Sequence, residues 1–126
     1  MKSKYMIISR KRTIPPLSIC IKSNALEQCS SYKYLGIFID KDLKWNTHIQ
    51  YITKKVLKAC GAMAKLRHSI DISTLKNIYF ALVHSYIRYG LLIWGNASSS
   101  ALCPLYTAIH KVLRTTYYDF CPIWKY

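Results

Sequence analysis

The fold is decided by one stretch, Tyr32-Lys33-Tyr34-Leu35-Gly36-Ile37-Phe38-Ile39-Asp40-Lys41-Asp42-Leu43-Lys44-Trp45. Its centre is rich in β-branched and aromatic apolar residues, and this pattern predicts a strand at residues 34–39. Gly36 leaves room for a close backbone approach, and Asp40 and Asp42 supply turn chemistry. We therefore expect a strand, a turn and the start of a long helix, with sheet before this stretch and helix after it.

The chain before this stretch contains short apolar or alternating segments that are typical of strands. They lie at residues 5–9, 17–21 and 25–29. Pro15 and Pro16 separate the first two segments, because proline cannot donate to a strand ladder. Arg10, Lys11 and Arg12 lie in the same connection, where they would either contact phosphates or form a solvated loop. Together with residues 34–39, these segments predict a small antiparallel sheet.

The chain after this stretch has helical periodicity. A first helix is predicted to begin near Thr47, where Thr47 and Gln50 fit a capping box. Its apolar residues recur at spacings of three and four, which is typical of a core-facing stripe: Ile49, Ile52, Val56, Cys60 and Met63. The basic residues on roughly the opposite side are Lys54, Lys58 and Lys65. Gly61 is unfavourable in mid-helix and predicts a close helix crossing.

Two further helices are predicted downstream. The second has Ser73 as its N-cap and ends at Gly90. Residues 91–94 are apolar on all sides, so we expect them to be buried. Pro104 is predicted to lie in the first turn of the third helix. The sequence thus predicts an α+β fold, in which a small antiparallel sheet is followed by a mainly helical bundle.

The composition indicates a folded and strongly basic chain. Hydrophobic residues make up 52% of the chain, which is enough to form a core. The length of 126 residues fits one domain and is too short for a complete polymerase. Nineteen Lys and Arg residues stand against five Asp and Glu residues, which gives a net charge of +14. A purely solubilising surface is one interpretation of this excess. We favour a polyanionic partner, nucleic acid ahead of an acidic membrane surface.

The cysteines and the apolar segments bear on the cellular compartment. The five cysteines are scattered, without a Cys-x-x-Cys pair, which argues against a zinc site and a disulfide framework. The first residues lack the sustained apolar run of a signal peptide, so we expect an intracellular protein of the nucleus or cytoplasm rather than a secreted one. Residues 75–95 are apolar but contain Lys76, His84 and Arg88. A central Arg costs about 2.5 to 3.5 kcal/mol in a membrane, so we expect no membrane span.

Two blocks of the sequence resemble the reverse transcriptases of non-long-terminal-repeat retrotransposons. The first is similar to the end of their polymerase domain and comprises Lys33-Tyr34-Leu35-Gly36-Ile37-x-Ile39-Asp40, Leu43-x-Trp45 and His48-Ile49. The second is similar to the region after the polymerase palm and comprises residues 84–95, Pro104-Leu105-Tyr106 and Val112-Leu113-Arg114. Ser85 departs from the Pro often found in that block. The order and spacing of both blocks fit, and the resemblance covers residues 2–117.

The resemblance implies a role for several parts of the chain. Residues 1–45 would be the end of the palm, residues 46–116 a helical thumb-like region and residues 117–126 a tail. Tyr34, Leu35 and Gly36 would lie in the hairpin that grips the primer, although an ordinary core strand would also explain them. The thumb-like helices would hold an RNA or RNA–DNA duplex by its phosphates. The candidate contacts there are Lys54, Lys55, Lys58, Lys65 and Arg67.

The carboxylates do not form a recognisable polymerase centre. Nucleotide transfer uses metal ions held by carboxylates, and the carboxylate residues are Glu27, Asp40, Asp42, Asp71 and Asp119. In the resembled family an upstream Asp-Asp motif forms the catalytic site, and no residues here match it. Lys2 has a position similar to that of a palm lysine thought to assist pyrophosphate departure. We expect no catalytic residue, metal ligand or cofactor in this chain, with Mg²⁺ belonging to the missing catalytic part.

The sequence therefore predicts a nucleic-acid-binding fragment of a retrotransposon RNA-directed DNA polymerase. The fragment would contribute to primer–template grip and would not polymerise DNA by itself. Its partners would be an RNA or RNA–DNA duplex and the missing part of the polymerase. Two alternatives stay open: a non-functional translated transposon remnant, and a basic module for protein or membrane contact.

Overall fold

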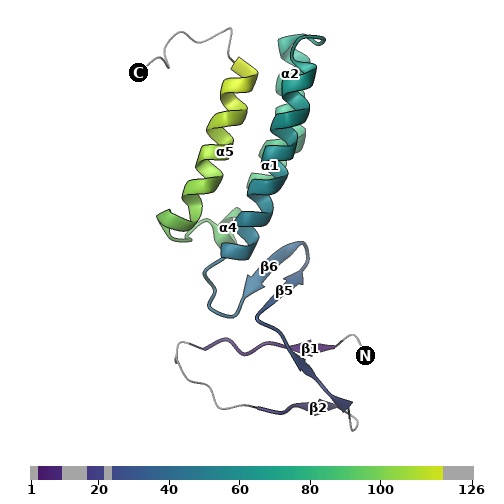
Figure 1. The fold of residues 1–126 in the computed structure, drawn as a ribbon, viewed down its shortest axis with the longest axis vertical. Coiled ribbons are helices and arrows are strands. Elements are labelled where there is room, and N and C mark those ends of the chain that lie inside the picture. The colour runs from purple at the N-terminus through teal and green to yellow at the C-terminus, as the bar shows by residue number, and fades with distance from the viewer. Residues whose placement is uncertain (1–2, 10–16, 22–23, 118–126) are drawn as a thin grey trace. The chain divides into compact units, whose positions relative to one another are not determined.

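A computed structural model describes residues 3–9, 17–21 and 24–117 (Figure 1). The chain divides into two units, Met1–His48 and Ile49–Tyr126. In the described residues, every strand belongs to the first unit, and the helices belong to the second apart from the start of the first helix. The predicted α+β class is confirmed. Lys2, the basic connection at residues 10–12 and the tail at residues 118–126 lie outside the described residues.

The described residues of the first unit form three two-stranded ladders. The strands are β1 (Lys4–Tyr5), β2 (Cys20–Ile21), β3 (Asn24–Ala25), β4 (Glu27–Gln28), β5 (Ser31–Tyr34) and β6 (Ile37–Asp40). The β2–β3 and β5–β6 ladders are antiparallel as predicted, whereas β1 and β4 pair in parallel. The described strands thus form separate ladders and not the one small antiparallel sheet that the sequence predicted. Strands β1 to β4 have only two residues each. The segments predicted as strands at residues 5–9, 17–21 and 25–29 are therefore too short to form one ladder.

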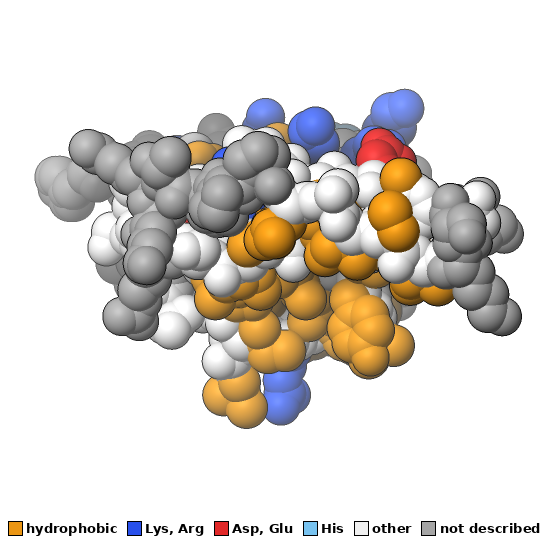
Figure 2. All heavy atoms as spheres, turned by 90° about the horizontal axis from the view of Figure 1, so that it is seen from below, with side chains coloured by type: hydrophobic (Ala, Val, Ile, Leu, Met, Phe, Trp, Pro, Cys, Tyr) orange, Lys and Arg blue, Asp and Glu red, His pale blue; other side chains and the backbone are white. Residues whose placement is uncertain are grey.

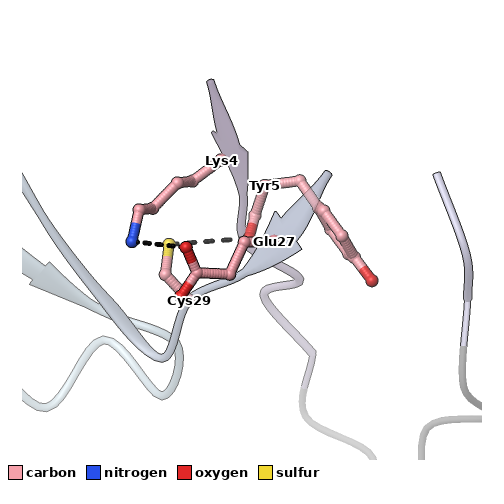
Figure 3. A network of polar contacts seen from close by, with 4 residues as sticks. All are labelled: Lys4, Tyr5, Glu27 and Cys29. Carbon is pink, nitrogen blue, oxygen red and sulfur yellow. Dashed lines mark hydrogen bonds and ion pairs between the residues drawn. The ribbon is translucent and has the colours of Figure 1, made fainter. Parts of the chain in front are cut away.

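Polar contacts accompany the β1–β4 ladder (Figure 3). The Lys4 ammonium lies 2.8 Å from a carboxylate oxygen of Glu27, its neighbour across the ladder. The hydrogen bond to Glu27 raises the pKa of Lys4 above its usual value. The backbone N–H of Cys29 donates to the Tyr5 carbonyl at 2.9 Å, and the Cys29 thiol donates to the same oxygen at 3.5 Å. Side-chain contacts therefore supplement a ladder of only two residue pairs.

Strands β5 and β6 form a hairpin where the sequence predicted a single strand at residues 34–39. Tyr34 pairs with Ile37, so Leu35 and Gly36 are the two loop residues. Their φ angles are 45° and 84°, and positive φ at both positions is typical of the type I′ turn that matches the twist of a hairpin. The apolar run concealed this turn because Leu is uncommon at such a position.

The hairpin is linked to the start of α1 (Asn46–Leu66) by two hydrogen bonds. The Thr47 N–H donates to an Asp40 carboxylate oxygen at 3.2 Å. The Phe38 N–H donates to Nδ1 of His48 at 3.3 Å. Asp40 therefore satisfies a backbone donor at the helix start, a role that the sequence assigned to a capping box of Thr47 and Gln50. The predicted turn after the strand is confirmed, because the Leu43 N–H donates to the Asp40 carbonyl at 2.9 Å.

The burial of His48 predicts that the first unit loses stability in acid. Its side chain is only 2% exposed, and burial lowers its pKa below the usual 6.5, with a smaller opposing effect from Asp40. The unfolded chain therefore binds a proton more readily than the folded chain. Stability should be complete above about pH 6.5 and should decrease as the pH falls below that value. Thermal unfolding between pH 5 and 8 measures this loss.

A matched variant separates His48 from other titrating groups. In His48→Asn, the side-chain oxygen can accept the Phe38 N–H but cannot be protonated in this range. We expect its melting temperature to change less than that of the wild type between pH 7 and 5. Equal acid sensitivity of both proteins would show that His48 is not the cause.

The second unit is a group of helices (Figure 1). Most of its buried side chains are apolar. Besides α1, the helices are α2 (Ile72–Tyr79), the π-helix η1 (Phe80–His84), α3 (Ser85–Arg88), α4 (Leu91–Trp94) and α5 (Ser99–Tyr117). The predicted α1 stripe is confirmed, since all five of its residues are buried. Leu75, Val83, Trp94, Leu105 and Val112 supply buried side chains from the other helices.

The second predicted helix is continuous in the chain but changes type along its length. It begins with Asp71 as its N-cap rather than Ser73, because the Asp71 carboxylate accepts hydrogen bonds from the Thr74 N–H at 2.9 Å and hydroxyl at 2.7 Å. These hydrogen bonds hold the pKa of Asp71 well below its usual value. The helix passes through η1 and ends before Gly90, whose φ of 66° confirms the predicted stop.

The segment at residues 91–94 corrects a second expectation. Only Trp94 is buried, at 1% exposure, and its indole N–H donates to the Tyr89 carbonyl at 3.0 Å. Leu91 and Ile93 are exposed, and Leu92 is 102% exposed. At Gly95 an added Cβ would lie 2.5 Å from the Leu91 carbonyl oxygen, so this turn requires glycine. One buried anchor therefore holds a turn whose other apolar side chains face solvent.

The last helix starts earlier than predicted. Ser98 precedes α5, its carbonyl accepts from the Leu102 N–H at 3.1 Å, and its hydroxyl accepts from the Ala101 N–H at 3.4 Å. Pro104 therefore lies inside the helix and not in its first turn. None of the helices in the described residues is both long and apolar enough to cross a membrane.

Candidate nucleic-acid interface

Three exposed lysines form one face of α1. Lys54, Lys58 and Lys65 are spaced by four and seven residues, which places them in one row along the helix. At 1.5 Å per residue, the row extends for about 16 Å. The buried stripe of α1 requires this row to face away from the core. We call these three residues the lysine face.

Lys55 has a different environment from the lysine face. Its side chain is half-buried, and its ammonium group lies 5.6 Å from the Tyr51 ring centre and 5.7 Å from the Tyr86 ring centre. Attraction between a cation and two ring faces supports the packing of α1 beside α3. A phosphate contact by Lys55 stays a prediction, and the structure gives this residue a packing role.

Arg67 lies just beyond the end of α1. Its backbone N–H donates to the Met63 carbonyl at 2.9 Å, and its guanidinium Nε donates to Nε2 of His68 at 3.0 Å. The side chain is half-buried. Arg67 therefore continues the basic character of α1 into the following turn, and its contact with nucleic acid stays a prediction.

Gly61 lies on the lysine face and not at a helix crossing. It is exposed, and an added Cβ would meet no described atom within 4 Å. Its spacing of three residues from Lys58 and four from Lys65 places it between them. The predicted close crossing is wrong, because no described residue packs against Gly61. Glycine in a helix interior costs about 1 kcal/mol relative to Ala, and no contact within the described chain offsets this cost.

Tyr34, Leu35 and Gly36 form the tip of the β5–β6 hairpin. Tyr34 is 59% exposed and Leu35 is 73% exposed. The interpretation of these residues as an ordinary core strand is therefore wrong. Leu35 also has a left-handed backbone conformation that is unfavourable for Leu. An exposed apolar residue held in such a conformation is more common at functional sites than elsewhere.

A substitution at the hairpin tip tests whether Leu35 is there for stability. Leu35→Asn introduces a residue that tolerates positive φ and is common in this turn. We expect it to stabilise the fold by about 1 kcal/mol, measured by thermal unfolding, and to weaken duplex binding. Leu43→Asn is the matched control, because Leu43 is exposed and also has a positive φ of 52°. Unchanged binding by Leu35→Asn would exclude its side chain from the site.

Among the curated relatives of this chain are three polymerases of Drosophila melanogaster. The "Probable RNA-directed DNA polymerase from transposon X-element" is 28% identical over 117 residues, which are 90% of this chain and 13% of the relative. The "RNA-directed DNA polymerase from mobile element jockey" is 27% identical over 99 residues, 76% of this chain and 11% of the relative. The "Probable RNA-directed DNA polymerase from transposon BS" is 30% identical over 94 residues, 71% of this chain and 10% of the relative.

This chain resembles a segment of a retrotransposon RNA-directed DNA polymerase. The resemblance predicted from the two sequence blocks is thereby confirmed. The chain spans only 10 to 13% of the length of these relatives. No family model matches the chain, and no solved structure matches it significantly.

Three of the five carboxylate residues of this polymerase-like segment have structural partners. Glu27 pairs with Lys4, Asp40 accepts from the start of α1, and Asp71 caps α2. In the described part of the chain, no three His, Cys, Asp or Glu residues are grouped so that they could hold a metal ion. Asp119 lies outside that part. The geometry thus points to the lysine face and the hairpin tip as the two candidate contact surfaces, one in each unit.

The sequence identified the lysines of α1, but it did not show how Gly61 and Lys55 are placed relative to them. It assigned Gly61 to a helix crossing, although its spacing from Lys58 and Lys65 already placed it among the basic residues. It also included Lys55 among the candidate phosphate contacts, although Lys55 lies one residue, or about 100° of helix rotation, from Lys54. A helical projection of residues 46–66 places Gly61 among the three lysines and Lys55 outside their row, and it needs only the spacing of these residues.

Proposed function

We propose that this chain binds an RNA or RNA–DNA duplex as part of a retrotransposon reverse transcriptase. The observation that carries the proposal is the lysine face, an exposed row of basic residues on a helix whose opposite stripe is buried. Helix α1 contains no acidic residue that would repel phosphates. The net charge of +14 and the names of the relatives support the same class of partner.

The proposed contacts are to the nucleic-acid backbone. Lysine ammonium groups neutralise phosphates without reading bases, so binding should depend on duplex shape and charge. The hairpin tip would add an apolar contact through Tyr34 and Leu35 to the sugar or base surface of the primer. Lys55 and Arg67 would contribute to the basic field around α1. The protein would act inside the cell, where such templates occur.

Neutralising the lysine face tests the proposal. Replacing Lys54, Lys58 and Lys65 by Gln should weaken binding to an RNA–DNA hybrid duplex. It should also reduce the slope of log affinity against log salt by about two to three, since each lost phosphate contact contributes about 0.7 to 0.9. Fluorescence anisotropy across a salt series measures both quantities, and circular dichroism on the same samples establishes folding.

A second triple variant controls for overall charge. Arg88, Lys111 and Arg114 are exposed on α3 and α5, and their replacement by Gln removes the same number of charges. We expect this variant to lose less affinity than the first. Equal losses would show a diffuse charge effect, and a folded wild-type chain that binds no duplex would favour a protein or membrane contact module. An unfolded chain would favour a transposon remnant.

We also propose that this chain does not synthesise DNA by itself. No residues match the Asp-Asp motif of the resembled family, and the Mg²⁺ ions of the reaction would be held by another part of the polymerase. Primer extension by the purified chain with Mg²⁺ and nucleotides should give no product. Incorporation that follows the protein through purification would contradict this expectation.

A further inference from the structure

Gly61 leaves the lysine face without a side chain between Lys58 and Lys65. The surrounding surface is open, because a Cβ at Gly61 would have no described neighbour within 4 Å. Ala64, three residues further along the helix, is also exposed and small. The chain therefore has a low region on the outer side of α1, with a lysine on either side of it along the helix.

The usual reasons for a helical glycine do not apply to Gly61. It lies well inside α1 and is not at a helix end, where glycine often serves as a cap. It does not have the positive φ found at Gly36 and Gly90. Gly61 has no described atom close enough to exclude a side chain, whereas at Gly95 the Leu91 carbonyl oxygen leaves no room for a Cβ. The absent side chain thus weakens the helix without improving any contact described within the chain.

We propose that Gly61 is the point of closest approach between α1 and a bound nucleic-acid strand. The sugar-phosphate backbone would lie over Gly61, and the ammonium groups of Lys58 and Lys65 would reach phosphates on either side. This inference rests on the proposed function and specifies where the strand lies. Charge complementarity selects the occupant, because the low region is bordered by lysines and α1 has no acidic residue.

The same surface predicts binding without sequence preference. Residues 54–65 contain no Arg, Asn or Gln, the side chains that make most bidentate contacts with base edges. Contact at Gly61 would be made by the helix backbone and the sugar-phosphate chain, which are the same at every nucleotide. The fit at Gly61 therefore adds shape recognition to the attraction supplied by the lysines.

The test adds side-chain bulk at Gly61 without changing charge. Gly61→Ala and Gly61→Leu should both fold, since both residues favour helix more than glycine does. We expect affinity for an RNA–DNA hybrid duplex to fall about threefold for Ala and about tenfold or more for Leu. The salt slope should stay at the wild-type value, because no phosphate contact is lost. Ala62→Leu adds similar bulk about 100° away around the helix and should bind like the wild type.

The outcomes separate this inference from the proposed function. Loss of binding in the lysine triple variant with unchanged binding in Gly61→Leu would overturn the close approach and leave the proposed function standing. Unchanged binding in the lysine variant would overturn both. Equal weakening by Gly61→Leu and Ala62→Leu would show that bulk anywhere on α1 interferes, and this too would overturn the inference. Binding of poly-glutamate with the same sensitivity to Gly61→Leu would replace the nucleic-acid strand by an acidic polypeptide.

Discussion

Burial of one apolar stripe on α1 is the constraint on which the second unit depends. Ile49, Ile52, Val56, Cys60 and Met63 are all buried, and this fixes the rotation of the helix about its own axis. Once that rotation is fixed, Lys54, Lys58 and Lys65 must face outwards and Gly61 must lie among them. The proposed binding surface is thus a consequence of core packing.

The periodic parts of this fold could be predicted from the sequence, and the parts set by single residues could not. The α1 stripe repeats over four turns, so its burial follows from spacing alone. The turn at Leu35 and Gly36 lies inside an apolar run, where the usual turn residues are absent, and only the backbone angles show it. Residues 91–94 have the composition of a buried segment, but the single anchor at Trp94 leaves the other side chains no core to enter.

The same distinction applies to the candidate site. The positions of the lysines on α1 followed from the helical period, and the exposure of the lysine face agrees with that period. The engagement of Lys55 by Tyr51 and Tyr86 could not be predicted, because Tyr86 comes from a distant part of the sequence. Tertiary contacts thus decide which basic residues face solvent and which support packing.

In this basic chain, aromatic rings contact several lysine ammonium groups, a role that carboxylates usually fill in proteins. With five acidic residues for nineteen Lys and Arg residues, most cations cannot find a carboxylate. Lys33 lies over Phe38, Lys55 over Tyr86 and Lys76 over Tyr117, each with the ammonium group 5.6 to 5.7 Å from the ring centre. Such contacts hold ammonium groups against the protein surface without an acidic partner.

The exposed turn of α4 bears on how the chain behaves in solution. Leu91, Leu92 and Ile93 face solvent. Exposed hydrophobic side chains are also visible in Figure 2. At low ionic strength, mutual repulsion between chains of charge +14 opposes contact between such surfaces. Salt shortens the range of that repulsion to about 10 Å at 0.1 M and about 3 Å at 1 M. The chain's colloidal stability should therefore decrease as salt is added, the reverse of ordinary salting-in.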